Sequence, residues 1–206
     1  MQLTVRQLGR RPYAEVFDEM RGFTESRTAD SIDELWVTEH DPVFTQGQAG
    51  KAEHVLFPGE IPVLQTDRGG QVTYHGPGQL VVYLLLDIRR AGITPRGLVS
   101  AIEDAIVACL EGYQIEAAAR RDAPGVYVGE KKIASLGLRI RRGRSYHGLS
   151  FNIDMDLEPF NRINPCGMQG LEVTQLADLT DQTNLGEVGG SLLAHLTRTL
   201  EQAAAD

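Results

Sequence analysis

Hydrophobic side chains recur at helical spacing in three segments of the chain, and each recurrence predicts an amphipathic helix. The second of these helices begins at Thr94, where the hydroxyl can cap the helix and Pro95 fits its first turn. The third extends from about Gly186 to Ala204. The repeating positions are Tyr13, Val16, Phe17, Met20 and Phe23, then Leu98, Ile102, Ile106 and Leu110, and finally Leu192, Leu196 and Leu200.

Short apolar and β-branched runs between these segments predict strands. The run Leu80–Ile88 is hydrophobic on both faces, as expected for a central buried strand. The other predicted strands are Leu3–Leu8, Glu34–His40, Pro62–Gln65, Val72–Tyr74, Val126–Val128, Ile133–Arg142 and Tyr146–Ile153. Because strands and helices are interspersed, we expect an α+β fold in which helices pack on a mixed sheet.

The composition is that of a soluble globular protein, with 42% hydrophobic and 23% charged residues among 206. No internal repeat, low-complexity tract or linker is visible, so we expect a single domain, 1–206. The longest apolar run, Leu80–Leu86, is far shorter than the roughly 20 residues of a membrane helix, and no signal peptide is visible. Two widely spaced cysteines do not form a disulfide framework, which favours a reducing cytoplasm.

The formal net charge of −8 argues against general nucleic-acid binding. Positive charge is nevertheless concentrated in one acid-free stretch, which comprises Lys131, Lys132, Arg139, Arg141, Arg142 and Arg144. Two interpretations stay open: a solvated pair of strands, or a docking patch for an acidic macromolecule.

The two cysteines have different surroundings. Cys109 falls on the apolar stripe of the second predicted helix, where cysteine acts as a small hydrophobic residue. Cys166 lies in Arg162–Gly167, RINPCG, which has neither helical nor strand periodicity. Pro165 stiffens this segment, and Gly167 leaves room for a substrate carbonyl. We therefore regard Cys166 as a candidate nucleophile, with the N–H groups of Cys166 and Gly167 as hypothetical oxyanion donors.

A nucleophilic thiol needs a base or a neighbouring cation at neutral pH. The candidates are His75, His147 and the lysines. Lys132 is notable because it precedes the apolar and small segment 133–138, where a partly buried amine is suited to proton transfer.

Glycine is concentrated in the stretch 68–80, RGGQVTYHGPGQL, which adjoins the predicted central strand. This predicts a shaped backbone that approaches a ligand. It lacks the spacing and lysine of a phosphate-binding loop, and no residues of the chain have the usual spacing of metal ligands.

Three blocks of the chain together resemble the lipoyl(octanoyl) transferase family, and they occur in the family's order over nearly the whole chain. The first block is RGGQVTYHGPGQLVVY, 68–83. The second is GVYV, 125–128, followed by KKIASLGLRI and SYHGLSFNID, and the third is FNRINPCGMQGLEVTQL, 160–176.

The resemblance implies a fold shared with the catalytic domains of lipoate- and biotin-protein ligases. It also implies a Cys/Lys pair, carried by Cys166 and Lys132, because the family's lysine directly precedes the Ile-Ala-Ser segment. The implied acyl pocket consists of Arg68, Gly69, Gly70, Gln71, Val72, Thr73, Tyr74, His75, Ser135, Leu136, Gly137, Gly148, Leu149 and Ser150.

The activity implied is transfer of an octanoyl or lipoyl group, without a cofactor, from acyl carrier protein to a protein lysine. The implied acceptors are lipoyl domains of 2-oxoacid dehydrogenases and the glycine cleavage H protein. Acyl carrier proteins and lipoyl domains are acidic, which would suit the basic stretch as a docking patch.

Three other functions are weighed against transfer. They are an ATP-dependent lipoate or biotin ligase of the same fold, a non-catalytic binder of acyl carrier protein or lipoyl domains, and a Cys/His thioesterase that uses His75 or His147.

Overall fold

The computed structural model describes residues 2–121 and 123–205. In this part of the chain the strands form a seven-stranded sheet, in the order β1-β2-β6-β10-β9-β8-β7, and a three-stranded sheet, β4-β3-β5. The larger sheet comprises β1 (Leu3–Arg11), β2 (Asp33–His40), β6 (Gln79–Leu85), β7 (Ala118–Ala119), β8 (Val126–Val128), β9 (Lys131–Arg141) and β10 (Arg144–Asn152). The smaller comprises β3 (Val43–Gln46), β4 (Val63–Gln65) and β5 (Val72–His75).

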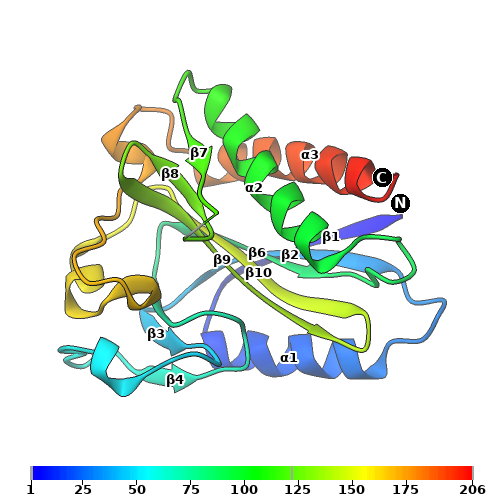
Figure 1. Cartoon of the computed structure of the whole chain (residues 1–206), viewed down its shortest axis with the longest axis horizontal. Helices are drawn as coiled ribbons and strands as arrows, with labels where there is room; N and C mark the ends of the chain where they lie inside the picture. Colours follow the sequence, from blue (N-terminus) through cyan, green and yellow to red (C-terminus); the bar gives the residue numbers. More distant parts are fainter. Residues whose placement is uncertain (1, 122, 206) are drawn as a thin grey trace.

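Helices cover both faces of the larger sheet, which is mixed because β1 and β2 are parallel and the other pairs are antiparallel. Helices α2 (Pro95–Glu111) and α3 (Leu185–Ala203) lie side by side on one face, and α1 (Tyr13–Ser26) lies on the other (Figure 1). The smaller sheet lies beside α1, and the two ends of the chain are close together (Figure 1). The α+β prediction is therefore confirmed. No helix in the described residues is long and apolar enough to cross a membrane.

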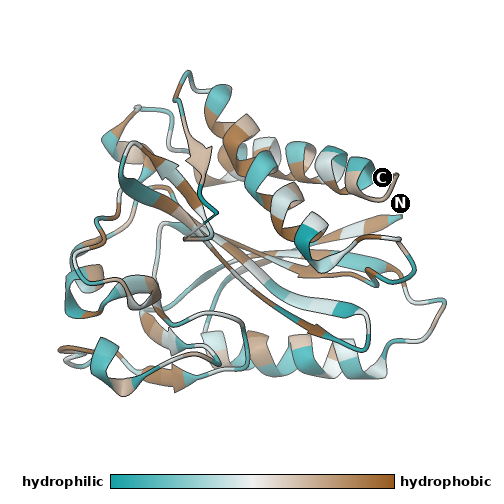
Figure 2. Ribbon diagram, in the orientation of Figure 1, coloured by the Kyte–Doolittle hydropathy of each residue, from teal (hydrophilic) through white to brown (hydrophobic). Residues whose placement is uncertain are grey.

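Strand β6 is buried along its whole length and contributes to two hydrophobic cores. Its side chains alternate between the faces of the sheet. Leu80, Val82 and Leu84 belong to the larger core under α2 and α3, whereas Val81 and Tyr83 belong to the core under α1. Figure 2 shows hydrophobic residues recurring along these central strands. Val81 and Tyr83, the two residues of this strand in the α1 core named above, also line the cavity described below.

The three predicted helices all form. The Thr94 hydroxyl accepts a hydrogen bond from the Gly97 N–H at 3.0 Å, and Pro95 occupies the first turn, as predicted. Several short elements were not predicted from the sequence. Strands β3 and β7 were not predicted, and two-residue β7 is too short to show a pattern. Three single-turn 3₁₀ helices, η2 (Glu158–Arg162), η3 (Pro165–Gly167) and η4 (Leu176–Asp178), occupy the segment after β10.

A buried ion pair joins the end of α1 to the central sheet. The Arg27 guanidinium donates to the Asp33 carboxylate and to the Leu85 carbonyl, and both charged side chains are almost fully inaccessible. Asp33 also accepts from the Asp87 N–H at 2.8 Å and pairs with Arg90 at 2.8 Å. Because one carboxylate compensates two cations and a backbone amide, removing it leaves Arg27 buried without its counter-charge.

We therefore expect Asp33→Ala to lower the free energy of unfolding by about 3–5 kcal/mol. Asp41→Ala is the matched control, because Asp41 forms an exposed pair with Arg10 and should cost less than about 1 kcal/mol. Urea unfolding followed by circular dichroism measures both. Equal losses for the two variants would contradict the structural role given to Asp33.

Candidate functional site

Lys132 and Cys166 are in contact, although 34 positions separate them in the sequence. The Lys132 Nζ lies 3.1 Å from the Cys166 Sγ and donates to the Pro124 carbonyl at 2.8 Å. Lys132 is 2% exposed, whereas Cys166 is half-buried. An amine of this kind can hold or release a proton directly at a thiol that remains accessible to a substrate.

The backbone of β9 fixes this contact. The Lys132 N–H donates to the Glu172 carbonyl, and the Lys132 carbonyl accepts from the Thr174 N–H, both at 2.9 Å. The chain that follows Cys166 is thereby paired with the strand that carries the lysine. As a result, the segments that carry Lys132 and Cys166 lie next to each other and are joined by backbone hydrogen bonds.

Cys166 has a left-handed backbone conformation, with φ of 57°, in the single turn η3. Such a conformation is costly for a residue with a side chain and is concentrated at functional sites. The turn is closed by a hydrogen bond from the Gly167 N–H to the Asn164 carbonyl at 2.9 Å. This corrects the oxyanion hypothesis for Gly167, because its N–H already has an acceptor.

A cavity of about 450 Å³ opens beside the two residues. Apolar side chains that line it include Val81, Val99, Leu136, Leu138 and Leu149, and Met168 lies at its margin with Cys166. Its volume is in the range of about 300–1,000 Å³ that small-molecule sites occupy. A largely apolar cavity that contains a nucleophile suits a ligand with a hydrocarbon body and one reactive end.

Buried Arg68 holds the Gly-rich segment that forms one wall of the cavity. Its guanidinium donates to the carbonyls of Thr45, Gly69 and Gln71, and the Gly69 N–H donates to the Leu138 carbonyl of β9 at 2.9 Å. A Cβ on Gly137 would lie 3.2 Å from the Gly69 carbonyl oxygen, a tight contact that shows how closely the two backbones approach. The prediction that this stretch has a shaped backbone is explained by these contacts.

Among the residues predicted for the pocket, all but Tyr74 line the cavity. The Tyr74 side chain belongs instead to the separate cluster with Phe44 and Phe160, and its ring meets that of Phe160 edge-on at 5.5 Å. Lining residues that the sequence did not indicate as pocket residues are Tyr13, Val81, Tyr83, Val99, Ala123, Pro124, Leu138, His147 and Met168. They come from several elements, and only the tertiary fold brings them together.

Two histidines line the cavity but do not contact the thiol. His75 Nδ1 pairs with the Gln79 side chain at 2.7 Å, and His147 Nε2 pairs with the Asp67 carboxylate at 2.8 Å. Burial lowers the pKa of His147, and it lowers that of His75 to about 3. Burial alone would raise the pKa of Asp67, but hydrogen bonds from His147 and Tyr146 bring it down to about 2.

Cys109 is fully buried on α2, where burial raises the pKa of its thiol, in agreement with the structural interpretation. Among residues 2–121 and 123–205, no group of three His, Cys, Asp or Glu side chains could hold a metal ion.

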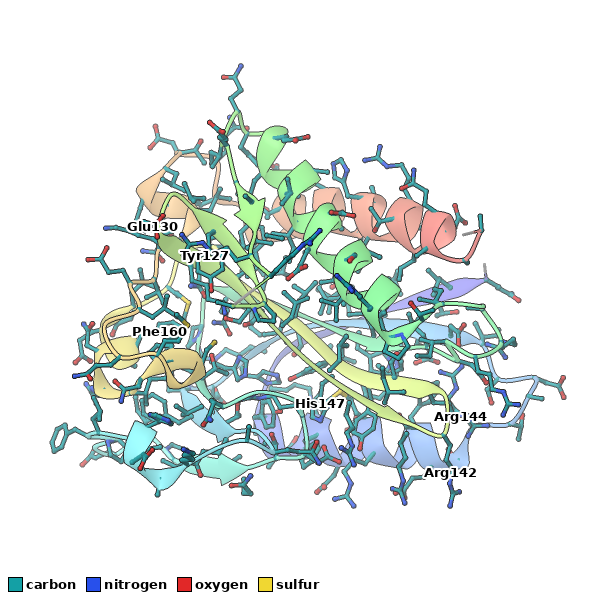
Figure 3. The ribbon with its side chains drawn as sticks, in the orientation of Figure 1. Tyr127, Glu130, Arg142, Arg144, His147 and Phe160 are labelled. Carbon is teal, nitrogen blue, oxygen red and sulfur yellow. The ribbon has the colours of Figure 1, made fainter. Side chains whose placement is uncertain are left out.

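The basic stretch does not form one patch near Cys166. Lys132 points into the interior, and Lys131 pairs with Glu172 at 3.5 Å. Arg141 pairs with Glu25 at the opposite end of β9, about 30 Å along the strand from Lys132. Figure 3 shows Arg142 and Arg144 at that end, away from Tyr127 and Phe160, whereas His147 lies in the interior. The structure therefore separates charges that the sequence places together.

The chain is similar to proteins of one family over nearly its whole length. Residues 12–197 match the model of the lipoyl protein ligase A/B catalytic domain. An octanoyltransferase of Stutzerimonas stutzeri (strain A1501) is 64% identical over 199 residues, which cover 97% of this chain and 91% of the relative. An octanoyltransferase of Hahella chejuensis is 60% identical over 196 residues, which cover 95% of this chain and 88% of the relative.

Solved structures with the same fold have low sequence identity. Lipoate-protein ligase A bound with ATP superimposes with a TM-score of 0.81 at 17% identity, over 97% of this chain and 86% of that one. A bipartite lipoate protein ligase from Thermoplasma acidophilum, described together with its E2 lipoyl domain, superimposes with a TM-score of 0.72 at 20% identity. The match covers 97% of this chain and 84% of that one. The biotin protein ligase of Aquifex aeolicus superimposes with a TM-score of 0.60 at 14% identity, over 98% of this chain and 71% of that one.

The fold thus defines the class as a catalytic domain of the lipoate- and biotin-protein ligase type, as the resemblance implied. The chain belongs to the lipoyl protein ligase A/B catalytic domain family and, within it, to the lipoyl(octanoyl) transferases.

The cavity histidine His75 predicts an acid-dependent loss of stability. Its pKa is about 3 in the folded state and about 6.5 in an unfolded chain, so between these values only the unfolded chain binds the proton. Its contribution to the free energy of unfolding is therefore complete above about pH 6.5 and decreases as the pH falls toward 3.

We expect His75→Gln to reduce the loss of stability between about pH 7 and about pH 5, a window above the range in which Asp67 titrates. Urea unfolding of both proteins at the two pH values measures this difference. If the free energy of unfolding depended on pH identically in the variant and the wild type, His75 would not be a group that stays unprotonated in the folded state.

Proposed function

We propose that the protein transfers an octanoyl or lipoyl group from acyl carrier protein to a lysine of a lipoyl domain, through an acyl-thioester on Cys166. Lys132 is the acid–base group of this reaction. The observation that carries the proposal is the 3.1 Å contact between the Lys132 amine and the Cys166 sulfur at an apolar cavity. The octanoyltransferases to which the chain is 60% and 64% identical support the choice of acyl group.

The first half-reaction forms the acyl-enzyme. Lys132 accepts the Cys166 proton, and the thiolate attacks the carbonyl of the incoming thioester. The bond to the phosphopantetheine sulfur breaks, and Lys132 returns the proton to that leaving thiol. One thioester replaces another, so this step needs neither ATP nor a cofactor.

The second half-reaction releases the acyl group to the acceptor. The amine of the acceptor lysine attacks the Cys166 thioester, an amide forms, and the cysteine sulfur leaves and regains a proton. Lys132 is placed to receive the proton that the amine loses and to return one to the sulfur. Because an amide is more stable than a thioester, the sequence of transfers runs downhill.

The apolar cavity provides affinity for the acyl chain. Each buried methylene contributes about 0.8 kcal/mol, so an eight-carbon chain is favoured over a much shorter one. The proposed substrate site is the cavity lining from Arg68 to His75, without Tyr74, together with that from Ser135 to Gly137 and from Gly148 to Ser150.

The proposed partners follow from the reaction. The donor is an acyl carrier protein, and the acceptors are lipoyl domains of 2-oxoacid dehydrogenases and the glycine cleavage H protein. A lipoyl domain accompanies one structural neighbour, the Thermoplasma acidophilum ligase. Both cysteines are free, which suits the reducing cytoplasm proposed as the compartment.

Incubation with octanoyl-acyl carrier protein, followed by intact-protein mass spectrometry, tests the acyl-enzyme. We expect an octanoyl adduct on the wild type and on Cys109→Ser, and none on Cys166→Ser. Cys109→Ser is the matched control, because it removes the chain's other thiol. An adduct on Cys166→Ser would refute the site. If no variant formed an adduct and the wild type exchanged pyrophosphate with ATP, the ATP-dependent ligase would replace the transferase.

Replacement of the proposed acid–base group should slow acylation without preventing folding. We expect Lys132→Ala to reduce the rate of adduct formation by about 10²–10⁴-fold, the usual contribution of a proton transfer. Lys131→Ala is the control, because the adjacent lysine is exposed and pairs with Glu172 at the surface. Rapid-quench mass spectrometry measures the rates, and a near wild-type rate in Lys132→Ala would exclude the assigned role.

A further inference from the structure

Helix α2 places a carboxylate close to the segment that holds Lys132. Glu103 is half-buried, and its Oε1 accepts a hydrogen bond from the Gly125 N–H at 2.9 Å. Burial raises the pKa of Glu103, while the Gly125 hydrogen bond and the charge of Lys132 act in the opposite direction. A carboxylate in such surroundings is costly unless its hydrogen bonds compensate. The mechanism above gives this side chain no role.

The hydrogen bond of Glu103 and that of Lys132 meet at a single peptide group. The Gly125 N–H, which donates to Glu103, and the Pro124 carbonyl, which accepts from Lys132, belong to the same peptide bond. In a trans peptide these two groups point in opposite directions. One peptide plane therefore lies between the carboxylate and the ammonium and is bonded to both.

Gly125 allows this plane to lie directly against the lysine. Its φ is +136°, and a Cβ at this position would lie 2.5 Å from Lys132 Cε and 2.6 Å from the Ala134 carbonyl oxygen. Both distances are shorter than real contacts permit, so only glycine fits here. The peptide is thus enclosed between Glu103 on one side and the Lys132 side chain on the other.

The result is a continuous hydrogen-bond chain that runs from Glu103 through the 124–125 peptide and Lys132 to Cys166. Its heavy-atom distances, in that order, are 2.9, 2.8 and 3.1 Å. Hydrogen bonds arranged in series polarise one another, and an anion at one end strengthens the carbonyl as an acceptor for a cation. The chain therefore both orients the ammonium and favours its charge.

We propose that Glu103 is a positioning residue for acyl transfer. Through the 124–125 peptide it fixes the carbonyl that directs the Lys132 amine to Cys166. This inference rests on the proposed Cys/Lys function. Other groups that face the chain are the Tyr127 ring, 5.4 Å from Lys132 Nζ and also covered by the Arg120 guanidinium, and Asp104 beside Glu103.

Two substitutions separate the charge of Glu103 from its hydrogen bond. Glu103→Gln keeps an oxygen acceptor for the Gly125 N–H, whereas Glu103→Leu removes both the acceptor and the charge. Loss of a hydrogen bond to a charged group corresponds to about a 10- to 100-fold change in rate, which we expect for Cys166 acylation in Glu103→Leu. Glu103→Gln should retain most of the rate at its own pH optimum.

The pH profile distinguishes positioning from a structural effect. Removing the anion disfavours the ammonium and relieves repulsion of the thiolate, so the pH–rate profile of both variants should move to lower pH. Glu111→Gln and Glu111→Leu are matched controls, because Glu111 is an exposed carboxylate on the same helix. They should change neither the rate nor the profile.

The decisive measurement is the rate of Cys166 alkylation by iodoacetamide as a function of pH, made in the Cys109→Ser background beside octanoyl-carrier acylation. Thermal unfolding by circular dichroism confirms that each protein is folded. An acid-shifted alkylation profile in both Glu103 variants supports the proposal, and profiles that match the wild type overturn it. Alkylation needs no acyl donor, so failure of the proposed transferase, seen as no wild-type adduct, is distinguishable from failure of the positioning role.

Discussion

The site depends on the burial of one amine. Lys132 is 2% exposed, and among residues 2–121 and 123–205 its Nζ has a carbonyl and a sulfur as hydrogen-bond partners. A buried ammonium is stable only where such partners are fixed in place. Gly125 must therefore bring its peptide against the side chain, and Cys166 must be held in a strained turn within reach of the amine. Much of the local backbone geometry follows from this requirement.

The topology meets this requirement by joining segments that are far apart in the sequence. Lys132 is the second residue of β9, which is flanked by β8 and β10, and the chain after Cys166 returns to form hydrogen bonds with Lys132. Helix α2, which packs on the opposite face from α1, reaches the site through Glu103. The core thus serves as the support that sets the distance between Lys132 on a strand and Cys166 in a loop.

Periodicity was sufficient to predict the elements that carry the core, because their burial is regular. The Thr94 cap and the leucines of α3 are examples of signals that depend only on near neighbours in the chain. The contact between Lys132 and Cys166 has no such signal, and its prediction rested on resemblance to a family. Tyr74 shows the limit of that resemblance, since a pocket motif in a strand includes a residue that packs elsewhere. Glu103 was missed because a carboxylate on an amphipathic helix is usually solvated, and only the tertiary structure shows its acceptor role.

The sequence was similarly ambiguous about the role of the basic stretch. The stretch from Lys131 to Arg144 is continuous along the chain, but a hairpin of two extended strands distributes it from the interior to a distant turn. Near the thiol, a buried cation, Lys132, and a half-buried anion, Glu103, are connected through a peptide, and a second buried cation, Arg68, lines the cavity. The proposed thioester donor brings its own activation, so such a site needs to control one proton and one sulfur. The short hydrogen-bond chain that ends at Cys166 suits that need.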